Sequence, residues 1–188
     1  MKTNWINNKM VAVIAAAVCL TGIAQAVPIS GNLGFSGSVE LNSSSVNTAT
    51  EATAWFNTVA ASPSGSFVGL VNSGDAVSMA GATPWSFNSG ALANFWKVDG
   101  FTFNLISSSI FSQAGGFLDV VLAGTVTGNG FTATAFNGTF QVADPASDGV
   151  AAFTERLSFN SVPDSGTTAM LLGCGLLSLG LFHRKMAA

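Results

Sequence analysis

The fold is decided by the stretch FLDVVLAGTVTGNGFTATAFNGTFQV at residues 117–142. Its first part, residues 117–126, is a nearly continuous apolar run of strand length, which predicts a central strand covered on both faces. The Gly128-Asn129-Gly130 segment then offers residues that tolerate positive φ in a tight turn, and residues 131–142 return with β-branched and aromatic side chains. The stretch therefore predicts a long antiparallel hairpin, in which Gly138 marks a bulge or a close approach.

The sequence around this hairpin is also of β type. Phe101, Phe103 and Leu105 alternate with polar residues, as expected of a strand with one buried face. No window between residues 27 and 160 combines a helical apolar stripe with caps at both ends. We therefore predict an all-β body, an antiparallel β-sandwich of jelly-roll type. Its further strands are predicted at residues 29–41, 55–60, 67–71, 76–80, 95–98 and 152–159, with polar loops at 42–53 and 143–149.

The charges of the chain are distributed unevenly. Residues 27–166 contain all nine acidic residues but only two of the six basic ones, Lys97 and Arg156. Nucleic acid and anionic lipid are therefore poor partners, because phosphate binding needs clusters of basic residues. Both cysteines, Cys19 and Cys174, lie outside this part of the chain. The body must be stabilised by packing alone, and its length suits a single hydrophobic core.

The N-terminus has the features of a secretory signal peptide. Two lysines precede an apolar stretch at residues 10–20, and Ala24-Gln25-Ala26 supplies small residues at a cleavage site. We expect a signal peptide at residues 1–26, removed by signal peptidase, followed by an exported domain at residues 27–160.

The C-terminal residues contain an apolar segment that suits a membrane. Residues 169–182 carry no charge, and Ser178 is the only polar side chain among them. A helix over these residues would be about 21 Å long, a marginal span of the hydrocarbon core. We expect a transmembrane helix at about 167–182, a basic end at residues 183–185 and a cytoplasmic location for Arg184 and Lys185.

A short polar motif precedes this segment. The composite resembles the C-terminal sorting signal of PEP-CTERM proteins, specifically the VPDSG-CTERM variant, through its motif Val162, Pro163, Asp164, Ser165 and Gly166, its glycine-containing apolar segment and its closing Arg184-Lys185. The resemblance implies processing of residues 161–188 by a membrane-embedded exosortase in a bacterium that makes exopolysaccharide. The protein would be anchored transiently in the inner membrane and then reach the cell surface or the extracellular matrix.

The body has few residues for catalysis. The single histidine, His183, lies in the basic end, and the chain has no tyrosine, so nucleophilic triads and zinc sites are excluded from the body. Hydrolysis of a glycoside by two carboxylates remains open, with Asp119 and Glu155 as strand-borne candidates. Solvated surface carboxylates are the preferred interpretation of this pair.

Two weaker patterns suggest binding. Asp144 and Asp148 could supply oxygen ligands to Ca²⁺, although an Asp-Pro turn explains the same loop. Trp85, between Pro84 and Ser86, is the tryptophan that we expect to be exposed, where it could contact a sugar ring, although tryptophans more often belong to the core.

These observations predict an exported, non-enzymatic protein with a structural or adhesive role linked to exopolysaccharide. The alternative is a secreted module that binds carbohydrate or calcium. The expected partners are an exosortase-like sorting protease, signal peptidase, exopolysaccharide and the membrane through the C-terminal helix. No nucleic acid and no cofactor other than Ca²⁺ is expected.

Overall fold

The computed structural model describes residues 26–144 and 150–159, which belong to one compact unit, the body of the protein. The predicted signal peptide, apart from Ala26, and the predicted sorting signal lie outside the described residues. Within the described ranges, no helix has the length and apolar character needed to span a bilayer. The predicted terminal helices therefore remain predictions.

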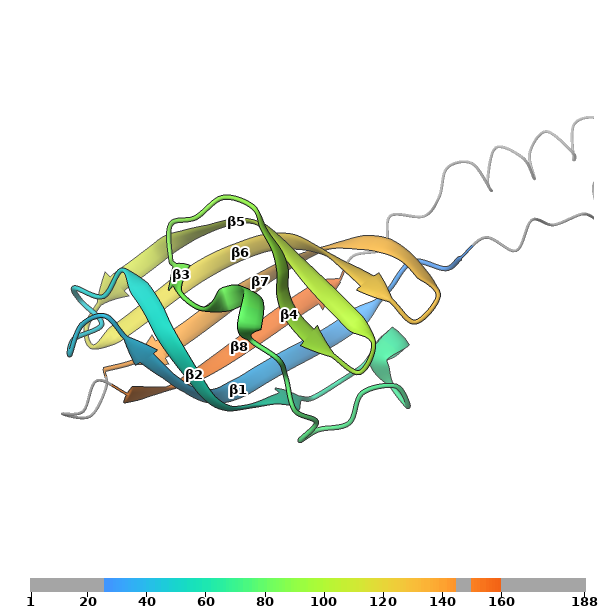
Figure 1. Ribbon diagram of the computed structural model, residues 1–188, viewed down its shortest axis with the longest axis horizontal. Coiled ribbons are helices and arrows are strands. Elements are labelled where there is room, and N and C mark those ends of the chain that lie inside the picture. Colours follow the sequence, from blue (N-terminus) through green and yellow to red (C-terminus); the bar gives the residue numbers. More distant parts are fainter. Residues whose placement is uncertain (1–25, 145–149, 160–188) are drawn as a thin grey trace, which may run out of the picture. The chain divides into compact units, whose positions relative to one another are not determined.

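The described part of the chain is almost entirely β (Figure 1). Its helical residues form two short 3₁₀ turns, η1 (Gly65–Phe67) and η2 (Ala80–Ala82). Its strands are β1 (Gly31–Leu41), β2 (Glu51–Ala61), β3 (Trp85–Ser86), β4 (Leu92–Val98), β5 (Phe101–Ala114), β6 (Phe117–Gly128), β7 (Phe131–Ala143) and β8 (Val150–Phe159).

The strands form one antiparallel sheet, so the all-β prediction is confirmed and the predicted sandwich is wrong. The strand order is β3-β2-β1-β8-β7-β6-β5-β4. β8 pairs with β1 on one side and with β7 on the other, which joins the first and last long strands in the middle of the sheet. Long strands twist and coil, so a single sheet curls around its own core. Inward and outward residues alternate in the same way as in a sandwich, which explains the error.

The predicted hairpin at residues 117–142 is confirmed as β6 and β7. Gly128, Asn129 and Gly130 all have positive φ in its turn. Gly138 marks a close approach, because a Cβ there would collide with the Leu157 side chain, and the pairing register continues through it without a bulge.

Two short segments connect the outer strands of the sheet. Residues 74–78 lie between β2 and β4. On the β2 side, Val77 N donates to Thr58 O at 2.9 Å, and on the β4 side, Ser78 N donates to Lys97 O at 2.9 Å. Residues 85–89 similarly link β2 to β5, since Ser108 N donates to Ser89 O at 2.9 Å. These bonds satisfy backbone groups that an open edge would expose.

The predicted strands at 67–71 and 76–80 are wrong. Residues 67–71 form the end of η1 and a turn, and 76–80 contribute isolated bridges at Ala76 and Ser78 before η2 begins at Ala80. Gly69 and Gly74, with φ of 78° and 100°, interrupt the extended backbone here. Phe67, Val71, Val77 and Met79 of these segments instead cover the core, whereas Val68 and Leu70 are exposed.

The core inside the curled sheet is aromatic. The Phe35 ring meets Trp96 and Phe103 edge-on at centroid separations of 5.5 and 5.6 Å. Such pairs contribute about 0.5–1.5 kcal/mol each beyond the area they bury. The other large, fully buried rings are those of Phe67, Trp85, Phe87, Phe95, Phe101, Phe136, Phe140 and Phe153. Ring-to-ring contacts thus stabilise a body whose described residues contain no cysteine.

A glycine on β6 makes room for one of these rings. A Cβ on Gly124 would collide with the Asn104 carbonyl oxygen and with the Phe136 ring. Gly124→Ala should therefore destabilise the body by about 1–3 kcal/mol through overpacking. The measurement is urea unfolding followed by tryptophan fluorescence.

Gly90→Ala is the matched control, because a Cβ at that position meets nothing within 4 Å. Its effect should stay within about 0.5 kcal/mol. Equal destabilisation by the two variants would contradict the packing argument.

Candidate functional site

Trp85 is not exposed, and the prediction that it could contact a sugar is wrong. Its exposed fraction is 0%, and its Nε1 donates to Ser108 Oγ at 3.2 Å. Its ring packs edge-on against Phe95 and Phe140, at centroid separations of 5.2 Å in both cases. The polar, turn-rich neighbours of Trp85 suggested a surface position, but the short β3 lies over the core and turns the indole inward.

The predicted calcium ligands are described only in part, since Asp148 lies outside the described residues. Asp144 Oδ1 accepts hydrogen bonds from Val46 N at 2.9 Å and from Ser45 Oγ at 3.3 Å. Asp144 therefore holds the loop between β1 and β2 in place. Among the described residues, no group of three or more acidic, histidine or cysteine side chains could hold a metal ion.

Asp119 and Glu155 lie on opposite faces of the sheet. Asp119 is on the outer face of β6, where its Oδ1 accepts a hydrogen bond from Gln141 Nε2 at 2.7 Å. Glu155 points into the core from β8 and is 2% exposed. Two carboxylates on opposite faces cannot flank one glycosidic bond, so this pair cannot act as a glycosidase.

The environment of Glu155 is apolar. It pairs with Phe35 on β1 and Phe140 on β7, and its inward neighbours on β8 are Phe153 and Leu157. Neither carboxyl oxygen has a hydrogen-bond partner among the described residues. Burial raises the pKa of Glu155 well above its ordinary value of 4.5, because the charged form is poorly solvated in the core.

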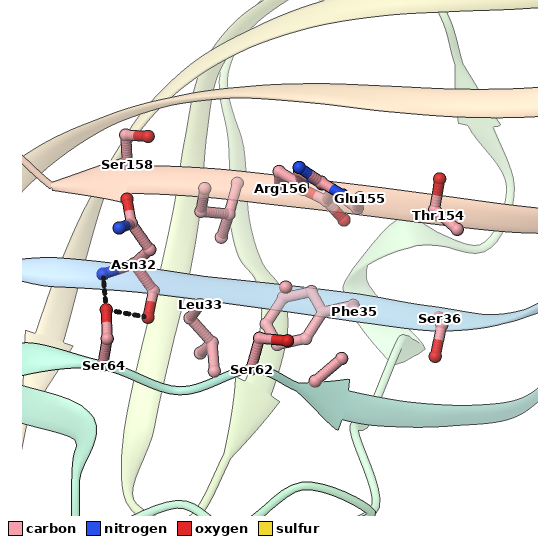
Figure 2. A pocket seen from close by; sticks show the side chains of 13 residues that line it. Asn32, Leu33, Phe35, Ser36, Ser62, Ser64, Thr154, Glu155, Arg156 and Ser158 are labelled. Carbon is pink, nitrogen blue, oxygen red and sulfur yellow. Dashed lines mark hydrogen bonds between the residues drawn. The ribbon is translucent and has the colours of Figure 1, made fainter.

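The other side of β8 lines a groove on the outer surface, shown in Figure 2. The groove runs over β1, between β8 and the segment that follows β2, and has a volume of about 620 Å³. Its polar lining comes from three parts of the chain: Asn32 and Ser36 on β1, Ser62 and Ser64 after β2, and Thr154, Arg156 and Ser158 on β8.

The wall after β2 is held by hydrogen bonds to β1. Asn32 N donates to Ser64 Oγ at 2.8 Å, and Ser64 N donates to Asn32 O at 2.9 Å. Gly34 lies at an outward position between Asn32 and Ser36 and pairs with both Ala61 and Arg156. Because Gly34 has no side chain, the groove is deeper beside the Arg156 guanidinium than a larger residue at this position would allow.

The body ends close to the predicted sorting motif. Phe159, the last residue of β8, is 4% exposed and pairs with Gly31 and Phe136. Residues 161–186, which begin two positions later, match the family model described as the VPDSG-CTERM motif. This segment is a VPDSG-CTERM sorting motif.

The VPDSG-CTERM match contains every part of the predicted signal. It covers the Val162-Pro163-Asp164-Ser165-Gly166 motif, the apolar segment and Arg184-Lys185. A VPDSG-CTERM segment is a PEP-CTERM-like exosortase sorting signal, so it implies an exported, membrane-transiting protein that an exosortase-type enzyme processes and that is sorted to the cell surface. No curated protein and no solved structure matches the chain.

The VPDSG-CTERM motif could be found from its sequence, whereas the groove was missed. One local signal was available: Arg156 is one of two basic residues between 27 and 166 and stands at an outward position of a strictly alternating strand. The serines and Asn32 carried no such signal, because their proximity to Arg156 depends on pairing between distant segments.

Burial of Glu155 predicts an unusual dependence of stability on pH. Above pH 4.5 the unfolded chain releases the Glu155 proton while the folded protein retains it, so the free energy of unfolding should fall by about 1.4 kcal/mol per pH unit until the raised pKa is reached. Glu155→Gln should remove this contribution and become more stable than the wild type as the pH rises. Urea unfolding between pH 4 and 8 measures the difference.

Glu40→Gln, on β1, is the control for this experiment and should keep the wild-type pH profile. If the Glu155→Gln profile ran parallel to that of the wild type, the buried carboxyl would not be the source of the pH dependence.

Proposed function

We propose that this protein is a non-enzymatic component of the cell surface or extracellular matrix, with a structural or adhesive role linked to exopolysaccharide. The observation that carries the proposal is the VPDSG-CTERM segment, which begins two residues after the last strand of the body. A chain that carries such a signal is the substrate of another enzyme, and its own role begins after sorting.

Features of the body support a non-enzymatic role. The described residues contain neither histidine nor cysteine, the side chains that most often act as general base or nucleophile. The one carboxylate pair considered for hydrolysis lies on two faces of the sheet. The interior is filled with aromatic side chains, and the groove is lined by hydroxyl groups, an amide and one guanidinium group. This lining suits binding better than bond cleavage.

We further propose the route by which the protein reaches its site. Signal peptidase removes residues 1–26, and a helix at about 167–182 then holds the protein in the inner membrane with Arg184 and Lys185 on the cytoplasmic side. The exosortase acts next and releases the body to the surface or matrix.

Intact mass spectrometry of the protein from the cell envelope and from the medium tests this route. In a strain with the exosortase, the mature protein should lack residues 169–182. In a strain without the enzyme, or with Asp164→Ala, which alters the sorting motif, it should retain them. Asp148→Ala is the control, because it removes an acidic residue outside the matched segment.

Residues 169–182 present in the mature protein of both strains would overturn the proposed processing. The segment would then be a permanent anchor.

A further inference from the structure

We infer that the groove over β1 and β8 is a binding site for an acidic polysaccharide, a polyhydroxylated chain that bears carboxylates. The inference extends the proposed function by naming a ligand class and a binding site. It rests on the proposed function only for the location, the cell surface or matrix, where the protein would encounter the polysaccharide. It concerns the outer face of the sheet, whereas the side chain of Glu155 points into the core.

Arg156 supplies the charge for this site. It is exposed on β8, and no ion pair involves its side chain within residues 26–144 and 150–159. A guanidinium group presents planar donors that match a carboxylate in a bidentate pair, which makes arginine the preferred residue for this recognition. Residues 27–160 contain eight acidic and two basic residues, so a free guanidinium in a groove is the feature that an anionic ligand would use.

The remaining polar groups of the groove suit hydroxyl groups on the ligand. The side chains of Ser36, Ser62, Thr154 and Ser158 can each donate and accept hydrogen bonds, as sugar hydroxyls can. The distance along β1 from Asn32 to Ser36 is about 14 Å, at the usual rise of a strand. The groove is therefore long enough for several units of a chain.

The floor of the groove gives the ligand access to Arg156. Gly34 is the outward residue directly opposite Arg156 on β1, and a Cβ there would already lie 3.0 Å from the Glu155 carbonyl oxygen. A larger residue at position 34 would fill the space beside the guanidinium. Glycine keeps this part of the groove open.

Other classes of ligand fit the groove less well. Nucleic acid requires several cationic side chains along its phosphates, and the described groove has one. A lipid chain would cover the hydroxyl, amide and guanidinium groups of the groove without forming hydrogen bonds to them, which is costly. One cation among many hydroxyl groups matches a chain with both carboxylates and hydroxyls.

Isothermal titration of the full chain in a nonionic detergent tests the inference. Polygalacturonate is the acidic probe, and the neutral polymer made by reducing its carboxylates is the comparison. We expect polygalacturonate to bind at least about tenfold more tightly than the reduced polymer, because a hydrogen bond to a charged group is stronger than a neutral one. Arg156→Gln should weaken the binding of polygalacturonate by about tenfold or more and should leave binding of the reduced polymer unchanged.

Two further variants sharpen this test. Lys97→Gln removes the other basic residue of the body, which is exposed on β4, and should leave affinity for polygalacturonate within about twofold of the wild type. Arg156→Lys keeps the charge but not the planar fork, so it should restore only part of the affinity lost in Arg156→Gln. Near-ultraviolet circular dichroism confirms that each variant is folded.

Three results would overturn the inference: no binding of polygalacturonate to the wild type, equal binding of the two polymers, or equal losses in Lys97→Gln and Arg156→Gln. None of them bears on processing of the VPDSG-CTERM segment, which the mass measurement tests separately. A failure of the binding inference and a failure of the proposed sorting are therefore distinguishable.

Discussion

The position of β8 between β1 and β7 is the constraint on which the rest of the body depends. Its pairing with β1 runs from Glu40↔Val150 to Gly31↔Phe159, and its pairing with β7 continues the sheet on the other side. Every second residue of β8 is buried and the others are exposed or half-buried. The same strand therefore contributes Phe153 and Leu157 to the core and Arg156 to the groove. A change in its register by one residue would exchange these two sets.

Local patterns in the sequence were sufficient to predict many of the elements. The glycines and Asn129 at residues 128–130 identified the turn between β6 and β7, and the alternation from Phe101 to Leu105 identified the start of β5. Both features involve residues that are close in the chain. Single residues that contact a distant segment, such as Gly138 beside Leu157, could be identified as unusual but without their partner.

Features that depend on distant pairing could not be predicted in this way. Alternating burial describes a strand in a sandwich and a strand in a single curled sheet equally well, and pairing of β1 with β8 distinguishes the two. The burial of Trp85 depends on how residues 85–89 bridge β2 and β5. The groove likewise requires β1, β8 and the residues after β2 to lie side by side, and this depends on pairing between distant segments.

The buried Glu155 affects stability differently from the acidic residues on the surface. In the core it is surrounded by aromatic and aliphatic side chains, and its oxygens lack partners among the described residues. An amide or aliphatic side chain of similar size would be expected there if stability alone mattered. The carboxyl group makes the body less stable as the pH rises above the ordinary pKa of a glutamate, while Arg156, the next residue, faces the solvent.

The pairing of β1 with β8 also determines when the body can become complete during export. Residues 31 and 159 are neighbours in the sheet although most of the body separates them in the chain. A chain that emerges from its N-terminus presents β1 early but lacks one of its neighbours until the last strand arrives. That strand ends two residues before the matched sorting segment. The last backbone pairs of the sheet and the sorting signal therefore become available at nearly the same moment of translocation.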